Sequence, residues 1–351
     1  MVVHIYVPMN KDSIRKIIFK TLRILQIEEY KYPYIYEKLK SKFNIFLDNQ
    51  NPKLYDIVFV IHDAKGWILE GICKEIVKYY SGKWYFAYSL DNLPPAKAYF
   101  FAHYAFFSIA LKRNPILWRS KNFVWYTHPK DIGREHEELI YTFNQATKII
   151  STCSEYVKLL QTQGVKPEKI TYVLGGADPE IFQYHERCHG VVGFCSSYYP
   201  RKSPDLMFNI IKSMPHRKFI LLGRDWEKYE NFAELIALQN LVYVEAPYSD
   251  YPQYYAQMDV FVSTSKLEGG PIPLIEAMMC NIVPVASRTG FAPDVIVHGS
   301  NGFIFDIDSD CETVCQLIEE AFNLKNNIRD TVYHLSWENF SLNIQSLLNN
   351  H

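Results

Sequence analysis

The chain has 351 residues, of which 48% are hydrophobic and 21% are charged, and its formal net charge is −1. This length is sufficient for two α/β domains, and the balanced charge excludes the overall basic field typical of nucleic-acid-binding proteins. The N-terminal MVVHIYVPMN lacks the pattern of a signal peptide. The most apolar run, 98–111, is too short to span a bilayer. We therefore expect a cytoplasmic protein, or one that lies peripherally on the cytoplasmic face of a membrane.

Short β-rich runs alternate with helical patterns through the first half of the chain. We predict strands at Val2–Val7, Asn44–Leu47, Asp56–Ile61, Trp84–Ser89, Ala98–Ala102, Phe123–Thr127 and Lys148–Ser151. Helical patterns between them include Ser13–Ile27 and Leu69–Tyr80. Nearly continuous apolar strands separated by helices are typical of a parallel sheet that is covered on both faces.

The second half of the chain repeats this alternation. We predict strands at Val191–Cys195, Lys218–Leu222, Leu241–Glu245, Val260–Val262 and Val283–Ala286. Helices are predicted at Pro204–Ser213, Glu227–Ala237, Tyr251–Met258, Leu274–Met279, Glu312–Asn323 and Trp337–Leu348. The α/β pattern therefore predicts two Rossmann-like, doubly wound parallel-sheet domains, 1–174 and 191–335, that face a central cleft. Residues 175–190, rich in turn-forming and charged residues, are the predicted linker.

The segment STSKLEGGPIPLIEAMMCNIVPVA, residues 263–286, joins a predicted strand to a helix that is expected to begin near Pro273. Gly269 and Gly270 have no Cβ, so the backbone there could approach a ligand closely. We expect the first amides of this helix, from Leu274 to Glu276, to be free and to form an anion site.

Two glutamates, Glu268 and Glu276, lie eight positions apart on either side of this turn. A carboxylate accepts two hydrogen bonds side by side, which matches vicinal hydroxyls on a sugar or a ribose. Glu276 taken alone has a second interpretation, as a helix-start carboxylate stabilised by the macrodipole. The glycines and Pro273 beside the two glutamates favour a ligand site.

These residues resemble the C-terminal domain of glycosyltransferase family 4, whose members are retaining enzymes with the GT-B fold and a Glu-x7-Glu signature. Further matching segments are GGADPEIF (175–182), VVGFCSSYYPRKSPDLM (191–207) and GFAPDVIVHGSNGFIFD (290–306). The resemblance implies that Glu268 contacts the donor sugar and Glu276 the ribose. It also implies that the C-terminal helix, 336–351, packs back on the first domain. The donor-binding set so implied comprises Ser196, Arg201, Lys202, Gly223, Ala246, Glu268, Gly269, Gly270, Pro271, Ile272, Leu274 and Glu276.

Arg201 and Lys202 match the family loop that holds the donor pyrophosphate. Cleavage of a glycosyl–phosphate bond builds negative charge on the diphosphate, which fixed cations stabilise. Members often carry a further arginine soon after the strand, where this chain has Ser196 or Ser197. No paired-aspartate motif follows a strand, so we expect no metal and no cofactor; the donor is a UDP-sugar or a GDP-sugar.

Three histidines lie at or near predicted strands of the first half. The resemblance places His128 at the end of a strand, close to the reacting sugar, and makes it a predicted catalytic residue with Glu268 and Lys202. The other interpretation of His128 is a structural one, and that interpretation is favoured for His62 and His103. The family's first-loop glycines are absent from VPMNKDS, residues 7–13.

The segment 14–43 combines an apolar stripe with basic residues, within a stretch that has nine Lys/Arg against four Asp/Glu from Lys11 to Lys42. It predicts either an interfacial helix on an anionic membrane or a core helix with a solvated basic edge.

The function that the resemblance implies is retaining transfer of a hexose-type sugar from a nucleotide-sugar donor to a glycan or lipid-linked acceptor. A nucleotide-sugar epimerase on the same scaffold and a non-catalytic, membrane-peripheral module are the two alternatives.

Overall fold

The computed structural model describes residues 55–62, 66, 68–129 and 136–350. The predicted strands Val2–Val7 and Asn44–Leu47, the helix Ser13–Ile27 and the basic segment 14–43 lie outside the described residues. In the part that is described, no helix combines the length and the apolar character needed to cross a membrane.

The first half of the chain forms a six-stranded parallel sheet in the order β2-β1-β3-β4-β5-β6. Its strands are β1 (Tyr55–Val60), β2 (Trp84–Ala87), β3 (Ala96–Phe101), β4 (Lys121–Tyr126), β5 (Lys148–Ser151) and β6 (Ile170–Tyr172). The helices of this half are α3 (Ile68–Lys78), α4 (Tyr104–Arg113), α5 (His136–Phe143) and α6 (Ser154–Thr162). The last four residues of β1 are all buried, as expected for a strand covered on both faces. Strand β6 was not predicted, because three residues are too few to show a periodic pattern.

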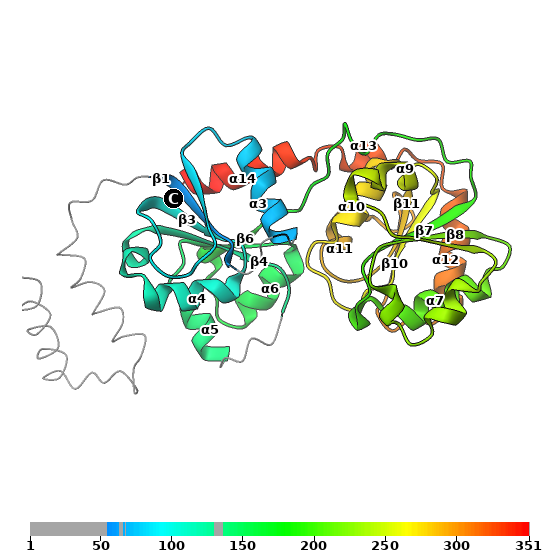
Figure 1. The fold of residues 1–351 in the computed structure, drawn as a ribbon, viewed down its shortest axis with the longest axis horizontal. Coiled ribbons are helices and arrows are strands. Elements are labelled where there is room, and N and C mark those ends of the chain that lie inside the picture. The colour runs from blue at the N-terminus through cyan, green and yellow to red at the C-terminus, as the bar shows by residue number, and fades with distance from the viewer. Residues whose placement is uncertain (1–54, 63–65, 67, 130–135, 351) are drawn as a thin grey trace, which may run out of the picture. The chain divides into compact units, whose positions relative to one another are not determined.

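The second half forms another six-stranded parallel sheet, in the order β12-β11-β10-β7-β8-β9. Its strands are β7 (Val191–Cys195), β8 (Lys218–Leu222), β9 (Leu241–Val244), β10 (Val260–Ser263), β11 (Val283–Ser287) and β12 (Phe303–Phe305). Its helices are α7 (Pro204–Ser213), α8 (Phe232–Ile236), α9 (Tyr251–Tyr255), α10 (Ile272–Met279), α11 (Ala292–Val295), α12 (Cys311–Asn323), α13 (Arg329–Val332) and α14 (Trp337–Asn349). Helices α9 and α10 lie on one side of this sheet, and α7 and α12 on the other (Figure 1). Both halves therefore have the Rossmann-like architecture that was predicted.

One predicted helix, 227–237, is wrong in its first half. A short 3₁₀ turn at Trp226–Lys228 ends at Tyr229, whose backbone is extended at φ −74° and ψ 129°. The Tyr229 hydroxyl donates a 2.7 Å hydrogen bond to Asp205 on α7. This long-range contact accompanies the extended backbone at Tyr229, and the α-helix begins only at Phe232.

The order of strands in the second sheet reverses at β7. The chain runs from β7 to β8 and β9 on one side, then crosses to β10, β11 and β12 on the other. Strands β7 and β10 pair in parallel, so their carboxyl ends lie side by side. In doubly wound sheets, ligands bind outside the carboxyl ends of the strands at such a reversal.

The described residues divide into two compact units, one of 55–125 with 136–149 and one of 126–129 with 150–350. Every side chain of the candidate site described below belongs to the second unit. The predicted linker and domain boundaries at residues 174 and 191 stay predictions.

Candidate functional site

Glu268, in the loop between β10 and α10, is paired with two cations. It is 6% exposed, and its Oε1 atom contacts both Lys202 Nζ and Arg201 Nη1, the latter at 3.0 Å. Burial alone would raise the pKa of the Glu268 carboxyl, but the attraction of Lys202 and then of Arg201 outweighs burial and holds that pKa below its ordinary value. Glu268 is therefore ionised near neutral pH and neutralises part of the charge of both cations.

Hydrogen bonds join the loop that carries the cations to the segment after β10. Arg201 Nη1 donates to the Leu267 carbonyl at 2.7 Å, and the Lys266 amide donates to the Arg201 carbonyl at 2.7 Å. The Thr264 hydroxyl donates to the Lys202 carbonyl at 2.7 Å. These bonds hold Arg201 and Lys202 beside the carboxyl end of β10, although the two segments are more than 60 residues apart in sequence.

Glu276, on α10, lies in a different environment. It is 1% exposed, and it accepts hydrogen bonds from the hydroxyls of Tyr248 at 2.5 Å and Tyr255 at 3.0 Å. Burial raises the pKa of the Glu276 carboxyl to about 7, although the two tyrosine hydroxyls act in the opposite direction. The two glutamates of the signature therefore have different partners in the structure: Glu268 pairs with cations, and Glu276 accepts from hydroxyl groups.

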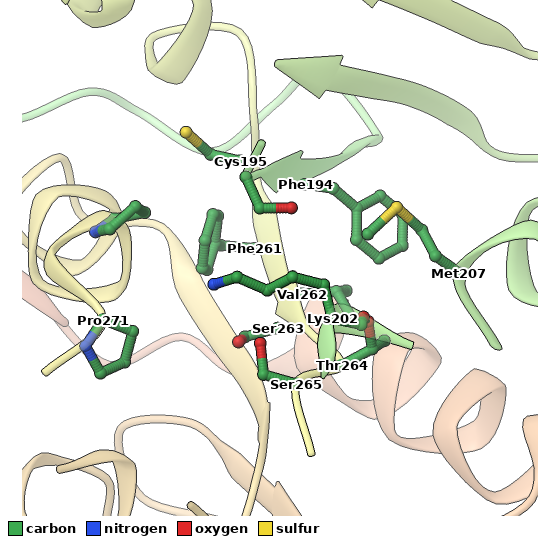
Figure 2. Close-up of a pocket in the computed structure, with 12 residues that line it drawn as sticks. Phe194, Cys195, Lys202, Met207, Phe261, Val262, Ser263, Thr264, Ser265 and Pro271 are labelled. Carbon is green, nitrogen blue, oxygen red and sulfur yellow. The ribbon is translucent and has the colours of Figure 1, made fainter. Parts of the chain in front are cut away.

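A small cavity of about 20 Å³ lies at the strand reversal between β7 and β10. Figure 2 shows the Lys202 side chain extending between Phe261 and the hydroxyl groups of Ser263 and Ser265. This volume holds about one water molecule, whereas drug-sized ligands occupy pockets of about 300–1,000 Å³. The cavity of about 20 Å³ is therefore much smaller than pockets of that class.

Only some of the predicted site residues line this cavity. Ser196, Lys202 and Pro271 line it, whereas neither Glu268 nor Glu276 does. Pro273, which the sequence analysis placed beside the predicted site, lines it too. Further lining residues that sequence reasoning missed are Phe194, Cys195, Met207, Phe261, Val262, Ser263, Thr264 and Ser265. Ser263 is the last residue of β10, and Thr264 and Ser265 follow it directly. A run of hydroxyl-bearing residues at the carboxyl end of a strand is the signal that could have identified these three residues.

The start of α10 differs from the prediction. The helix begins at Ile272 with Pro271 as its N-cap, and the Leu274 amide donates a 2.9 Å hydrogen bond to the Pro271 carbonyl. The expectation that the Leu274 amide is free is therefore wrong, because a tight first turn uses it internally. Pro271 and Pro273 have no amide hydrogen, which further limits the capacity of this helix start for anions.

Close packing against other parts of the protein explains why three positions of the predicted site are occupied by glycine. A Cβ on Gly269 would lie 2.2 Å from the Thr127 carbonyl oxygen, and one on Gly270 would lie 2.9 Å from the Phe291 ring. Gly223 has φ +155°, and a Cβ there would lie 2.0 Å from the Ser196 carbonyl oxygen. Contact of these glycines with a donor stays a prediction, as does that of the half-buried Ala246 after β9.

The histidines take up the positions expected at strand ends. His128 follows β4 and is partly buried, and its catalytic role stays a prediction. His103 caps α4, where its Nδ1 atom accepts from the Ala105 amide at 3.1 Å. The His62 ring packs edge-on against Phe106, with centroids 5.3 Å apart. These contacts support the structural interpretation of His103 and His62.

Residues 187–333 match the family model of glycosyl transferases group 1. An uncharacterized glycosyltransferase of Methanocaldococcus jannaschii is 23% identical over 218 residues, which are 59% of this chain and 60% of that relative. The O-antigen chain mannosyltransferase B of Escherichia coli is 25% identical over 206 residues, or 51% of this chain and 53% of that protein. The chain thus aligns with little more than half the length of these curated relatives.

The Anabaena protein HepE, solved in complex with UDP-glucose, is similar in fold. The two structures have a TM-score of 0.67 at 16% identity, over 85% of this chain and 100% of HepE. This similarity confirms the GT-B fold that the sequence predicted.

Proposed function

We propose that this chain is a glycosyltransferase that takes its sugar from a nucleotide-sugar donor. The observation that carries the proposal is the pairing of Lys202 and Arg201 with Glu268 where β7 and β10 end side by side. This position is the one at which doubly wound sheets bind ligands. The match of residues 187–333 to glycosyl transferases group 1 supports the same conclusion.

In the proposed complex, the donor diphosphate contacts Lys202 and Arg201. Both side chains are partly exposed, at 16% and 35%, and both are held by hydrogen bonds of their own loop to the segment after β10. A diphosphate that enters this position exchanges contacts with Glu268 for contacts with phosphate oxygens. The hydroxyls of Ser263 and Ser265 in the same cavity supply further donors to an anion.

Glu268 and Glu276 would then bind the two hydroxyl-bearing parts of the donor. Glu276 accepts hydroxyl hydrogen bonds in the empty site already, which suits a carboxylate that receives the ribose hydroxyls. Glu268, released from its cations, would accept from the hydroxyls of the sugar. The further donor contacts of Ser196, Gly223, Ala246, Gly269, Gly270, Pro271, Ile272 and Leu274 belong to this proposal too.

The proposed reaction breaks the bond between the anomeric carbon and the diphosphate oxygen. Negative charge grows on the leaving diphosphate, and Lys202 and Arg201 stabilise that charge most where it develops. The acceptor hydroxyl enters on the same face of the sugar and passes its proton to the departing diphosphate, with retention of configuration. His128 is proposed to bond a donor hydroxyl or phosphate oxygen.

The comparisons guide the choice of donors and acceptors to test. HepE was solved with UDP-glucose, so a UDP-hexose is the first donor to test, with GDP-mannose beside it. The name of the Escherichia coli relative, an O-antigen chain mannosyltransferase, supports a glycan or lipid-linked glycan as acceptor. We place the reaction in the cytoplasm and propose that it needs no metal ion. The proposal that the protein contacts a membrane surface is based on the basic, partly apolar segment 14–43.

The test is to incubate the protein with UDP-glucose, UDP-galactose, UDP-N-acetylglucosamine and GDP-mannose and to measure free nucleotide with and without acceptor glycolipid extracts. We expect nucleotide release that the acceptor stimulates, in the presence of EDTA as well. A changed sugar without nucleotide release would instead indicate an epimerase. Inertness to every donor, with no binding of any of them, would contradict the proposal. Nuclear magnetic resonance of the product's anomeric centre tests retention.

A further inference from the structure

The two tyrosines that donate to Glu276 differ in their surroundings. The side chain of Tyr255 is fully buried on α9, whereas Tyr248 is 54% exposed. Each donates to a different carboxylate oxygen, Tyr255 to Oε2 and Tyr248 to Oε1. One oxygen of Glu276 thus has a fixed internal partner, and the other has a partner at the surface.

Tyr248 lies in a short 3₁₀ turn, Tyr248–Asp250, that follows the carboxyl end of β9. Its ring contacts those of Phe182 and Tyr251, at centroid distances of 6.1 and 5.3 Å. The Tyr248 side chain is about half exposed, so its rotation costs less than that of a core residue. Tyr248 can leave Glu276 without opening the core around Tyr255.

A buried carboxylate oxygen without a donor is destabilising, and more so than a neutral group would be. The Tyr248 hydroxyl avoids this cost because it satisfies Oε1 of Glu276. A ribose hydroxyl has the same hydrogen-bonding capacity as the phenol hydroxyl, since each donates one bond and accepts others. A ribose hydroxyl could therefore take the place of the phenol hydroxyl on Oε1 of Glu276.

We propose that Tyr248 is a specificity-determining residue of the donor site, whose hydroxyl occupies in the empty protein the Glu276 oxygen that a ribose hydroxyl of the bound nucleotide takes. This inference rests on the proposed function, because it needs a nucleotide at Glu276. Binding of a ribonucleotide exchanges one hydroxyl for another on Oε1. A nucleotide without ribose hydroxyls leaves Tyr248 in place and gains nothing from Glu276.

Tyr248→Phe tests the proposal, because it keeps the ring contacts with Phe182 and Tyr251 and removes only the hydroxyl. In the empty variant, Oε1 of Glu276 loses its donor, so a ribose hydroxyl now satisfies an oxygen that was unsatisfied. We expect UDP or GDP, whichever the wild-type protein binds more tightly, to bind about tenfold more tightly, which is about 1.4 kcal/mol. The same nucleotide in its 2′,3′-dideoxy form is expected to bind within about twofold of wild type.

The matched control is Tyr251→Phe, the same chemical change three residues away. Tyr251 contacts the Tyr248 ring, and its hydroxyl has no hydrogen bond to Glu276 among those of the described residues. Calorimetry of both variants with both nucleotides should show a gain for Tyr248→Phe with the ribonucleotide alone. Thermal unfolding of the empty proteins should show a lower Tm for Tyr248→Phe than for Tyr251→Phe.

Three results would overturn the inference in different ways. Equal or weaker ribonucleotide binding by Tyr248→Phe shows that the hydroxyl is not a competitor. An equal gain for the dideoxy form shows that Tyr248 obstructs the site sterically and does not compete for Oε1. If the wild-type protein binds no nucleotide, both the proposed function and the inference are overturned. If the wild-type protein binds nucleotide and Tyr248→Phe has no effect on that binding, only the inference is overturned.

Discussion

Lys202 and Glu268 form a direct ion pair across 66 residues of sequence, at the point where the strand order of the second sheet reverses. The pair holds an ionised carboxylate where the proposed function places a diphosphate. Donor binding must therefore separate Lys202 from Glu268, and substitutions of the two residues should act in opposite directions on nucleotide affinity.

Lys202→Ala removes one of two cations from the proposed diphosphate site. We expect kcat/KM for the best nucleotide-sugar to fall by about 100- to 1,000-fold, because loss of one preorganised donor to developing charge costs about 2.7–4 kcal/mol. Steady-state measurement of nucleotide release checks this. Lys266→Ala is the control, since Lys266 contributes to the loop contact through its backbone amide and its side chain is exposed. Equal activity of Lys202→Ala and wild type would remove Lys202 from the site.

Glu268→Gln removes the carboxylate that competes with the diphosphate for Lys202 and Arg201. We expect UDP or GDP to bind more tightly by about threefold to tenfold, because both cations become available to phosphate oxygens. Transfer should nevertheless fall at least tenfold, because a neutral amide replaces the charged acceptor proposed for the sugar hydroxyls. Calorimetry and nucleotide-release assays on the same preparation separate the two effects. Weaker nucleotide binding together with weaker transfer would contradict the competition.

The pKa of Glu276, raised by burial to about 7, predicts a dependence of nucleotide binding on pH. The ionised carboxylate accepts two hydroxyl bonds, whereas the protonated form donates one, so affinity should fall as the pH is lowered from 8 to 6. The titratable groups around Glu276 among the described residues include Tyr248, Tyr255, Tyr251, Cys195 and Cys280. Glu276→Gln should bind nucleotide more weakly and lose the step near pH 7, as measured by titration at five or more pH values. An unchanged step in this variant would assign it to another group.

The raised pKa of Glu276 also makes the stability of the protein depend on pH, in the direction opposite to that of nucleotide affinity. The folded-state pKa of Glu276 lies above the ordinary value of 4.5, so the folded protein binds more protons than the unfolded chain between about pH 4.5 and 7. The contribution of Glu276 to the free energy of unfolding therefore decreases as the pH rises through this window. We expect Glu276→Gln to raise the Tm relative to wild type more at pH 8 than at pH 5. A larger gain at pH 5 would reverse the assigned sign.

Gly269→Ala tests whether packing against protein explains the double glycine. The added methyl group would lie 2.2 Å from the backbone carbonyl of Thr127, so backbone must move, at a cost of about 1–3 kcal/mol of folding free energy. Gly71→Ala, the fourth residue of α3 with nothing within 4 Å of the added Cβ, is the matched control and should stabilise the protein by about 0.5–1 kcal/mol. Urea denaturation of both variants measures the difference. A stable Gly269→Ala protein would contradict the packing explanation.

Local patterns predicted much of the fold. Buried strands such as Val191–Cys195 and Lys218–Leu222 have the bounds that their apolar runs indicated, because a strand covered on both faces needs apolar residues at successive positions. Short strands such as β6 and β12 escaped prediction, because three residues carry no readable period. The helix predicted at 227–237 shows that a local pattern can also indicate too much regular structure. The pattern there is helical, but the chain is extended at Tyr229, where the side chain contacts Asp205 on α7.

The two α/β halves, the spacing of Glu268 and Glu276, and the resemblance that identified Arg201 and Lys202 could all be read from the amino-acid sequence. The pairing of Glu268 with the two cations, and the hydrogen bonds that Glu276 accepts from Tyr248 and Tyr255, became visible only in the folded structure. The physical reason is that periodicity along the chain reports local burial, whereas the charge state and partners of a buried carboxylate depend on groups that the strand order brings together from distant segments.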